Sequence, residues 1–303
     1  MLHRPGLSFS YRLHEQLQVT ADPALELSKL LSWEVYEVEV KGRNSWHTTQ
    51  VNHGHSQSFN RYLFDLALLE KDFAEMPDDP HVLYYLGATN FAALEALVGR
   101  GEHTITPQMT EWIESGIKYL ELRTLPHHIR NSEIPQEQTW AAMRWLAYAY
   151  QHFQVDFKKA EHWYLQCISF DSERADCPVF LSKLYRSEGQ VDRAWSVVSD
   201  AIKVEFQERS FSNNFYIHQC SLPLETALTV IELLSKSGVD AASLPIFLFG
   251  WKLLRSAQTA CTSSSIGYLL ETEESVSEAE SAYRALAPQG DRGVSTLEVN
   301  KAT

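Results

Sequence analysis

Two stretches of this sequence repeat each other and decide the fold. Residues 143–167 read MRWLAYAYQHFQVDFKKAEHWYLQC, and residues 178–201 read PVFLSKLYRSEGQVDRAWSVVSDA. Three positions of the first stretch recur in the second at one constant offset, with Ala160 matched by Ala194, Tyr164 by Val198 and Cys167 by Ala201. Large residues fill a core and small residues fall where helices touch, so each stretch predicts a pair of packed helices.

The constant offset equals the period, about 34 residues, of the tetratricopeptide repeat (TPR), whose unit is a helical hairpin. A more degenerate unit precedes these two, with Leu83, Leu86 and Gly87 on its first helix and Trp112 and Gly116 on its second. The sequence therefore predicts a mainly α protein, a TPR-like antiparallel helix-hairpin solenoid. Such a stack is a scaffold, and its function depends on the residues placed upon it.

Further helices are expected on both sides of the repeats. Phe59, Leu63, Leu66 and Leu69 predict the apolar face of a helix, which ends at the Met-Pro-Asp-Asp-Pro segment of residues 76–80. Residues 223–236 and 241–256 predict two helices that close the stack, because an exposed apolar end would be insoluble. Residues 124–136 contain Pro126 and Pro135 and predict a linker, with His127 and His128 in a loop.

Residues 1–60 differ from the rest of the chain. Residues 33–40 alternate apolar and acidic side chains, as a half-buried strand does, and residues 46–51 suggest a return strand. We therefore expect three parts: a small β-containing N-terminal cap over residues 1–57, TPR-like repeats over residues 58–258, and an acidic tail over residues 259–303. The tail composition predicts disorder, with a short helix near residues 276–286.

Composition excludes two classes of partner. The 303 residues include 26 Lys and Arg against 39 Asp and Glu, a net charge of −13, and no basic run stands out. A general affinity for nucleic acid or for an anionic membrane is therefore not expected. The N-terminus has no apolar signal region, and no window has the length of an apolar membrane span. A cytoplasmic location is predicted.

The four cysteines are Cys167, Cys177, Cys220 and Cys261. They form no C-x-x-C pair and have no spacing typical of zinc sites. Cys167 and Cys220 lie among apolar or aromatic neighbours, where free cysteines usually pack as small hydrophobic residues. This pattern fits a reducing compartment.

Motifs of common catalytic sites are absent from the sequence. There is no phosphate-binding Gly loop, no G-x-S-x-G, no H-E-x-x-H and no D-x-D pair. What remains is an N-terminal cluster of His14, Glu15, His53 and His55. The plainer interpretation is that His14 and Glu15 are a half-site or relic, and that His53-Gly54-His55 is a solvated turn.

One order of residues resembles a known family. A short strand ending in His14-Glu15 is followed by a His-Gly turn at residues 53–55, an Arg-headed helix from Arg61, Pro-Asp-Asp-Pro at residues 77–80 and Tyr-Tyr-Leu-Gly at residues 84–87. Over residues 8–200 this order is similar to the C-terminal part of family 2 type glycosyltransferases with TPR-like repeats. The resemblance implies that His14 completes metal or diphosphate contacts and that Glu15 lies beside the acceptor site. In a complete enzyme the metal would be Mn²⁺ or Mg²⁺.

Two functions from different classes follow. The first is a C-terminal fragment of such a glycosyltransferase, expected to lack the nucleotide-sugar-binding half and to be inactive alone, with no cofactor of its own. The alternative is a free-standing TPR-like adaptor for protein–protein interaction. In both, the first helices of the repeats would line a concave groove that binds a protein or peptide, or a sugar acceptor stacked on aromatic rings.

Overall fold

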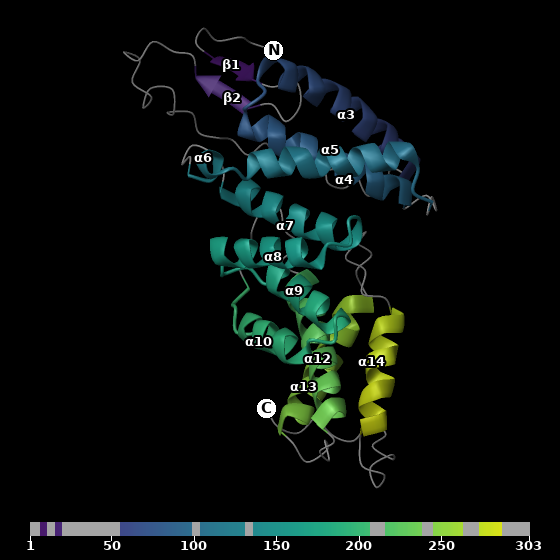
Figure 1. The fold of residues 1–303 in the computed structure, drawn as a ribbon. Coiled ribbons are helices and arrows are strands. Elements are labelled where there is room, and N and C mark those ends of the chain that lie inside the picture. Colours follow the sequence, from purple (N-terminus) through teal and green to yellow (C-terminus); the bar gives the residue numbers. More distant parts are fainter. Residues whose placement is uncertain are drawn as a thin grey trace, which may run out of the picture. The chain divides into compact units, whose positions relative to one another are not determined.

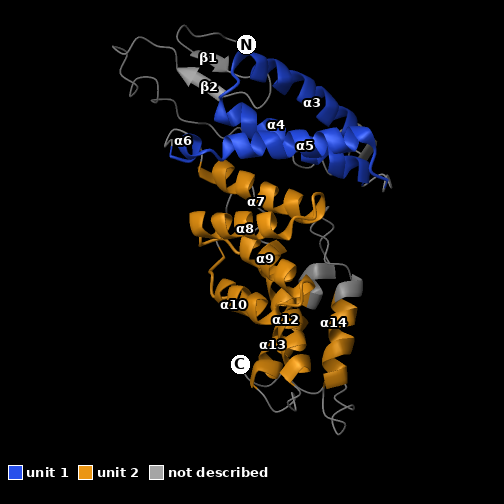
Figure 2. Cartoon of the chain, viewed as in Figure 1, with its two compact units in different colours: residues 1–134 blue, residues 135–303 orange. Residues whose placement is uncertain are grey.

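The computed structural model describes residues 7–10, 16–19, 55–98, 104–130, 136–206, 216–237, 245–262 and 273–286. The protein is mainly α (Figure 1). It divides into two compact units, Met1–Ile134 and Pro135–Thr303 (Figure 2). The boundaries predicted at residues 57 and 258 stay predictions. None of the described helices combines the length and apolar composition needed to cross a bilayer.

Two short strands lie near the N-terminus of the first unit. β1 (Leu7–Ser10) pairs antiparallel with β2 (Gln16–Val19), in a register that places Leu7 opposite Val19. The strands predicted at residues 33–40 and 46–51 lie outside the described residues. The three-stranded cap therefore stays a prediction.

The helices of the first unit are α3 (His55–Glu75), α4 (Pro80–Val98), α5 (Pro107–Arg123) and the four-residue α6 (Pro126–Ile129). Asp79 caps α4, because its Oδ1 accepts hydrogen bonds from the backbone N–H groups of His81 and Val82 at 2.9 and 3.0 Å. Two expectations were wrong. His55 begins a helix instead of lying in a turn, and the predicted linker loop contains α6.

A close contact fixes α4 against α5. A Cβ atom at Gly116 would lie 2.8 Å from Cζ of Phe91, and a Cβ atom at Gly87 would overlap Leu120. Gly87 thus meets Leu120 while Phe91, further along α4, meets the earlier Gly116, so the two helices run antiparallel. The start of α4 therefore lies beside the end of α5.

The second unit begins with two helical hairpins. They are α7 (Gln136–His152) with α8 (Phe157–Phe170), and α9 (Asp176–Ser187) with α10 (Val191–Ala201). All six residues that carry the repeat offset are buried. The sequence had therefore identified the buried face of both second helices correctly.

Local geometry repeats with the same offset. The turns of the two hairpins place Val155 at φ 53° and Gly189 at φ 70°, and the offset between them is the one that relates Ala160 to Ala194. In the first hairpin Lys159 Nζ lies 4.7 Å from the ring centre of Tyr150. In the second, the guanidinium carbon of Arg193 lies 4.1 Å from the ring centre of Tyr185. A cation from the second helix thus covers a tyrosine of the first helix in both hairpins.

Three further helices complete the second unit. A π-helical turn, η1 (Ile217–Ser221), leads into α12 (Leu222–Ser237), followed by α13 (Pro245–Thr262) and α14 (Glu273–Leu286). The short helix predicted near residues 276–286 is confirmed as α14, which begins slightly earlier, at Glu273. Its residues Val276, Ala279 and Tyr283 are buried in one core with α12 and α13.

A disulfide corrects the interpretation of the cysteines. Cys167 in the last turn of α8 is bonded to Cys177 in the first turn of α9. Cys220 is buried as expected, but it is also disulfide-bonded. The cysteines are therefore not the unpaired hydrophobic residues that the sequence suggested. Disulfides are rare in reducing compartments. The bond between Cys167 and Cys177 therefore weighs against the reducing compartment that the cysteine pattern predicted.

Candidate partner-binding surface

The catalytic residues predicted from the sequence fall where the structure gives no geometry. His14 and Glu15, predicted as catalytic residues with His14 as a metal ligand, lie outside the described residues, as does His53. For His55 the structure gives the start of α3 and nothing of the side chain. The glycosyltransferase site therefore stays a prediction.

Aromatic residues of α7 form one face of the second unit. Tyr148 lies at the centre of this group, with its ring 5.8 Å from Trp145, 4.4 Å from His152 and 5.7 Å from Phe153. Trp145 and His152 lie three and four positions from Tyr148 on α7, and side chains at these spacings are neighbours on a helix. Phe153 follows directly after the end of α7. Tyr148 is half-buried and His152 is exposed, so these rings offer a surface on which a ligand can stack.

A basic residue continues this face on α9. The pKa of His152 is lowered, first by partial burial and second by the positive charge of Lys183. Lys183 therefore lies near the aromatic group, on the first helix of the next hairpin. Lys183 thus adds a positive charge to this part of the surface.

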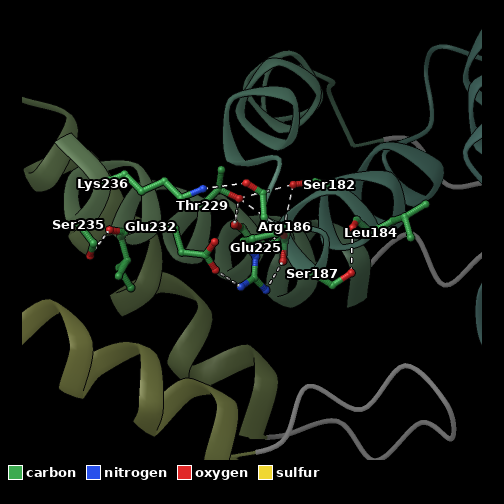
Figure 3. Close-up of polar contacts among 11 residues, drawn as sticks. Ser182, Leu184, Arg186, Ser187, Glu225, Thr229, Glu232, Ser235 and Lys236 are labelled. Carbon is green, nitrogen blue, oxygen red and sulfur yellow. Dashed lines mark hydrogen bonds and ion pairs between the residues drawn. The ribbon is translucent and has the colours of Figure 1, made fainter. Parts of the chain in front are cut away.

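Behind the face, a buried ion pair joins α9 to α12. The guanidinium of Arg186 makes two parallel contacts with the carboxylate of Glu225, Nε to Oε1 at 3.0 Å and Nη2 to Oε2 at 3.1 Å. The side chain of Glu225 is 0% exposed. The Ser182 hydroxyl also donates to Glu225 Oε1, at 2.9 Å (Figure 3). Glu225 is therefore a fully paired buried charge, the only form in which such a charge is well tolerated.

The same network reaches the surface on α12. Arg186 Nη1 lies 2.6 Å from Glu232 Oε1, and Lys236 Nζ donates to the backbone carbonyl of Gly189 at 2.7 Å. The two carboxylates raise the pKa of Arg186 although burial alone would lower it. Figure 3 shows Arg186 between Glu225 and Glu232. The network thus holds α9 against α12 and fixes the face to which α9 contributes.

A second buried arginine fixes the start of α7. Arg174 lies 3.0 Å from Glu137 and 2.9 Å from Asp171, and its guanidinium carbon lies 4.1 Å from the ring centre of Trp140. Sequence reasoning missed both arginine networks. Glu137 and Glu225 lie 37 and 39 positions from their arginines, and no short motif links residues at such distances.

Two groups of described residues are candidates for binding. Arg186 and Arg174 belong to neither, because both are paired with carboxylates. One cluster elsewhere has the donors for a metal ion, namely Asp78, His127 and His128 of the first unit. The aromatic group with Lys183 is therefore the candidate surface for a partner.

Comparisons with known proteins define no family. No family model and no curated relative matches the chain. Among solved structures, the chain is similar to the crystal structure of BtubC (BKLC) from P. vanneervenii, with 11% sequence identity and a TM-score of 0.46 over 78% of this chain and 84% of that chain. At this level of similarity the comparison carries no argument about function.

Proposed function

We propose that this chain is a TPR-like helical-repeat scaffold that binds a protein or peptide segment. One observation supports this most: the turn residues and the cations that cover a tyrosine recur at the repeat spacing in two hairpins. Repeats of this kind stack their first helices side by side, and that shared face forms an extended concave binding surface.

The proposed ligand is an extended peptide with an aromatic or apolar side chain and an acidic side chain. The rings of Tyr148, His152 and Phe153 suit the first, and Lys183 suits the second by charge. A local positive charge is distinctive in a chain of net charge −13. The buried pair of Arg186 and Glu225 supports preorganisation of this face, which lowers the entropic cost of binding.

The test selects peptides on the purified chain and measures their affinity by fluorescence polarisation. Lys183→Glu and Tyr148→Ala should each weaken the selected peptides about tenfold, a loss of about 1.4 kcal/mol. Lys158→Glu is the matched control, because Lys158 is an exposed lysine on the second helix α8. Selected peptides that bind all three variants equally would exclude this surface.

The link to a glycosyltransferase stays a separate prediction. Its test is binding of sugar nucleotides in the presence of Mn²⁺ or Mg²⁺, measured by calorimetry on the purified chain and on His14→Ala. Micromolar binding lost in the variant would support a surviving transferase site. Absence of binding would leave the scaffold function alone.

A further inference from the structure

Three side chains of the first unit bring metal-binding atoms together. Asp78 lies in the turn before α4, and His127 and His128 lie in α6 after α5. The antiparallel contact of α4 with α5 places the start of one beside the end of the other, which brings these two distant segments of the sequence together. One ligand atom from each of the three residues lies within 4.8 Å of the others.

The distances approach those of an occupied site. Asp78 Oδ1 lies 3.2 Å from His128 Nε2 and 3.5 Å from His127 Nε2. In a tetrahedral zinc site with bonds of about 2.0–2.2 Å, neighbouring ligand atoms lie about 3.4 Å apart. The two imidazole rings are already side by side, with centroids 4.0 Å apart.

His128 is the residue that an ion pair alone explains least well. Its side chain is 5% exposed, and its Nε2 has no hydrogen-bond partner although Asp78 lies at contact distance. Burial first, and then the nearby His127, lower its pKa. Histidine binds metals as the neutral imidazole, so its ring nitrogen must be unprotonated when an ion is bound.

The exposure of the other two ligands provides access. The side chains of His127 and Asp78 are 57% and 79% exposed, so an ion can enter from solvent and a water molecule can occupy a fourth position. An opposing charge comes from Arg123, which also lowers the pKa of His128. The positive charge of Arg123 would weaken the binding of a metal cation here, compared with a closed structural site of four ligands.

We propose that Asp78, His127 and His128 form a binding site for a divalent transition-metal ion of the zinc class. Two imidazoles and one carboxylate favour Zn²⁺, Ni²⁺ or Cu²⁺ over the oxygen-preferring Mg²⁺ and Ca²⁺. Three protein ligands with a water molecule are typical of open zinc sites. This site is distinct from the Mn²⁺ or Mg²⁺ site implied at His14, and it stands independently of the proposed scaffold function.

The experiment is a zinc titration of the tag-free, chelator-treated full chain against a fluorescent zinc chelator. The native chain should bind one Zn²⁺, and His127→Ala and Asp78→Asn should each weaken binding about tenfold or more. Both changes are at exposed positions, and circular dichroism checks that each variant folds. His162→Ala is the control for an exposed histidine on α8, and it should bind as the native chain does.

The outcomes separate this site from others in the chain. Zinc binding that is equal in the native chain, His127→Ala and Asp78→Asn would overturn the proposal, and so would no zinc binding at all. Loss of binding in His14→Ala but not in His127→Ala would assign the metal to the N-terminal segment and would equally overturn it.

Discussion

Removing the arginine of the buried pair between α9 and α12 should destabilise the second unit strongly. In Arg186→Ala the carboxylate of Glu225, which is 0% exposed, loses both contacts with the guanidinium and keeps only hydroxyl partners. Breaking a buried pair by removing one member costs roughly 3–5 kcal/mol. For a unit of this size, that loss lowers the midpoint of thermal unfolding by roughly 6–20 °C.

Thermal and urea unfolding, followed by circular dichroism, measure this loss. Lys203→Ala is the control, since Lys203 and its partner Asp200 are 72% and 78% exposed and a surface pair contributes at most about 1 kcal/mol. The second control is Arg186→Ala combined with Glu225→Gln. Because glutamine removes the unpaired charge, the double variant should recover at least half of the loss.

Two results would refute the reasoning. A loss below about 1 kcal/mol in Arg186→Ala would mean that water or nearby groups solvate Glu225, contrary to its burial. A double variant no more stable than Arg186→Ala would mean that lost packing, and not the unpaired charge, causes the destabilisation.

Three further predictions concern stability and use urea unfolding of the full chain. Val155→Gly should raise the free energy of unfolding by about 1 kcal/mol, because a β-branched residue is strained at φ 53°. Gly189→Val should lower the free energy of unfolding for the same reason. Equal effects of the two substitutions would contradict this explanation. Replacing Cys167 and Cys177 together by alanine should lower the free energy of unfolding by roughly 2–3 kcal/mol, since the disulfide closes a short loop; an unchanged urea midpoint, with these two cysteines found as free thiols in the native chain, would contradict the bond. Burial lowers the pKa of His128 in the folded chain. The unfolded chain therefore binds more protons at this histidine than the folded chain does. The folded state has its full stability above about pH 6.5, and it loses the contribution of His128 as the pH falls through the folded-state pKa. Stability should therefore fall from pH 7.5 to pH 5.5, and His128→Gln should reduce that slope.

Much of the helical part could be predicted because its signals are local. The repeat offset marked buried positions of α8 and α10, and the Met-Pro-Asp-Asp-Pro segment marked the end of α3. The prediction for α3 was less accurate, since Leu63 was placed on the apolar face but is 39% exposed. Leu66 and Leu69 are buried as predicted, and Phe59, Tyr62 and Phe73 pack against the same core, so Leu63 is the residue of the predicted face that departs from it.

The candidate sites could not be predicted because they depend on distant contacts. His127 and His128 were assigned to a loop, and nothing in their neighbourhood pointed to Asp78. Cys167 and Cys177 pair because the turn between α8 and α9 brings the end of one helix against the start of the next. Their sequence separation of 10 resembles no common cysteine motif, so the pairing gave no sequence signal.

The position of α14 has a consequence for protein synthesis. Tyr283 contacts Gly250 of α13, and its hydroxyl donates to the backbone carbonyl of Ala227 in α12 at 3.2 Å. A chain leaves the ribosome from its N-terminus, and its domains fold as they emerge. The apolar faces of α12 and α13 therefore stay uncovered until residues 273–286 have been translated. During that interval these uncovered faces are open to aggregation and to capture by chaperones.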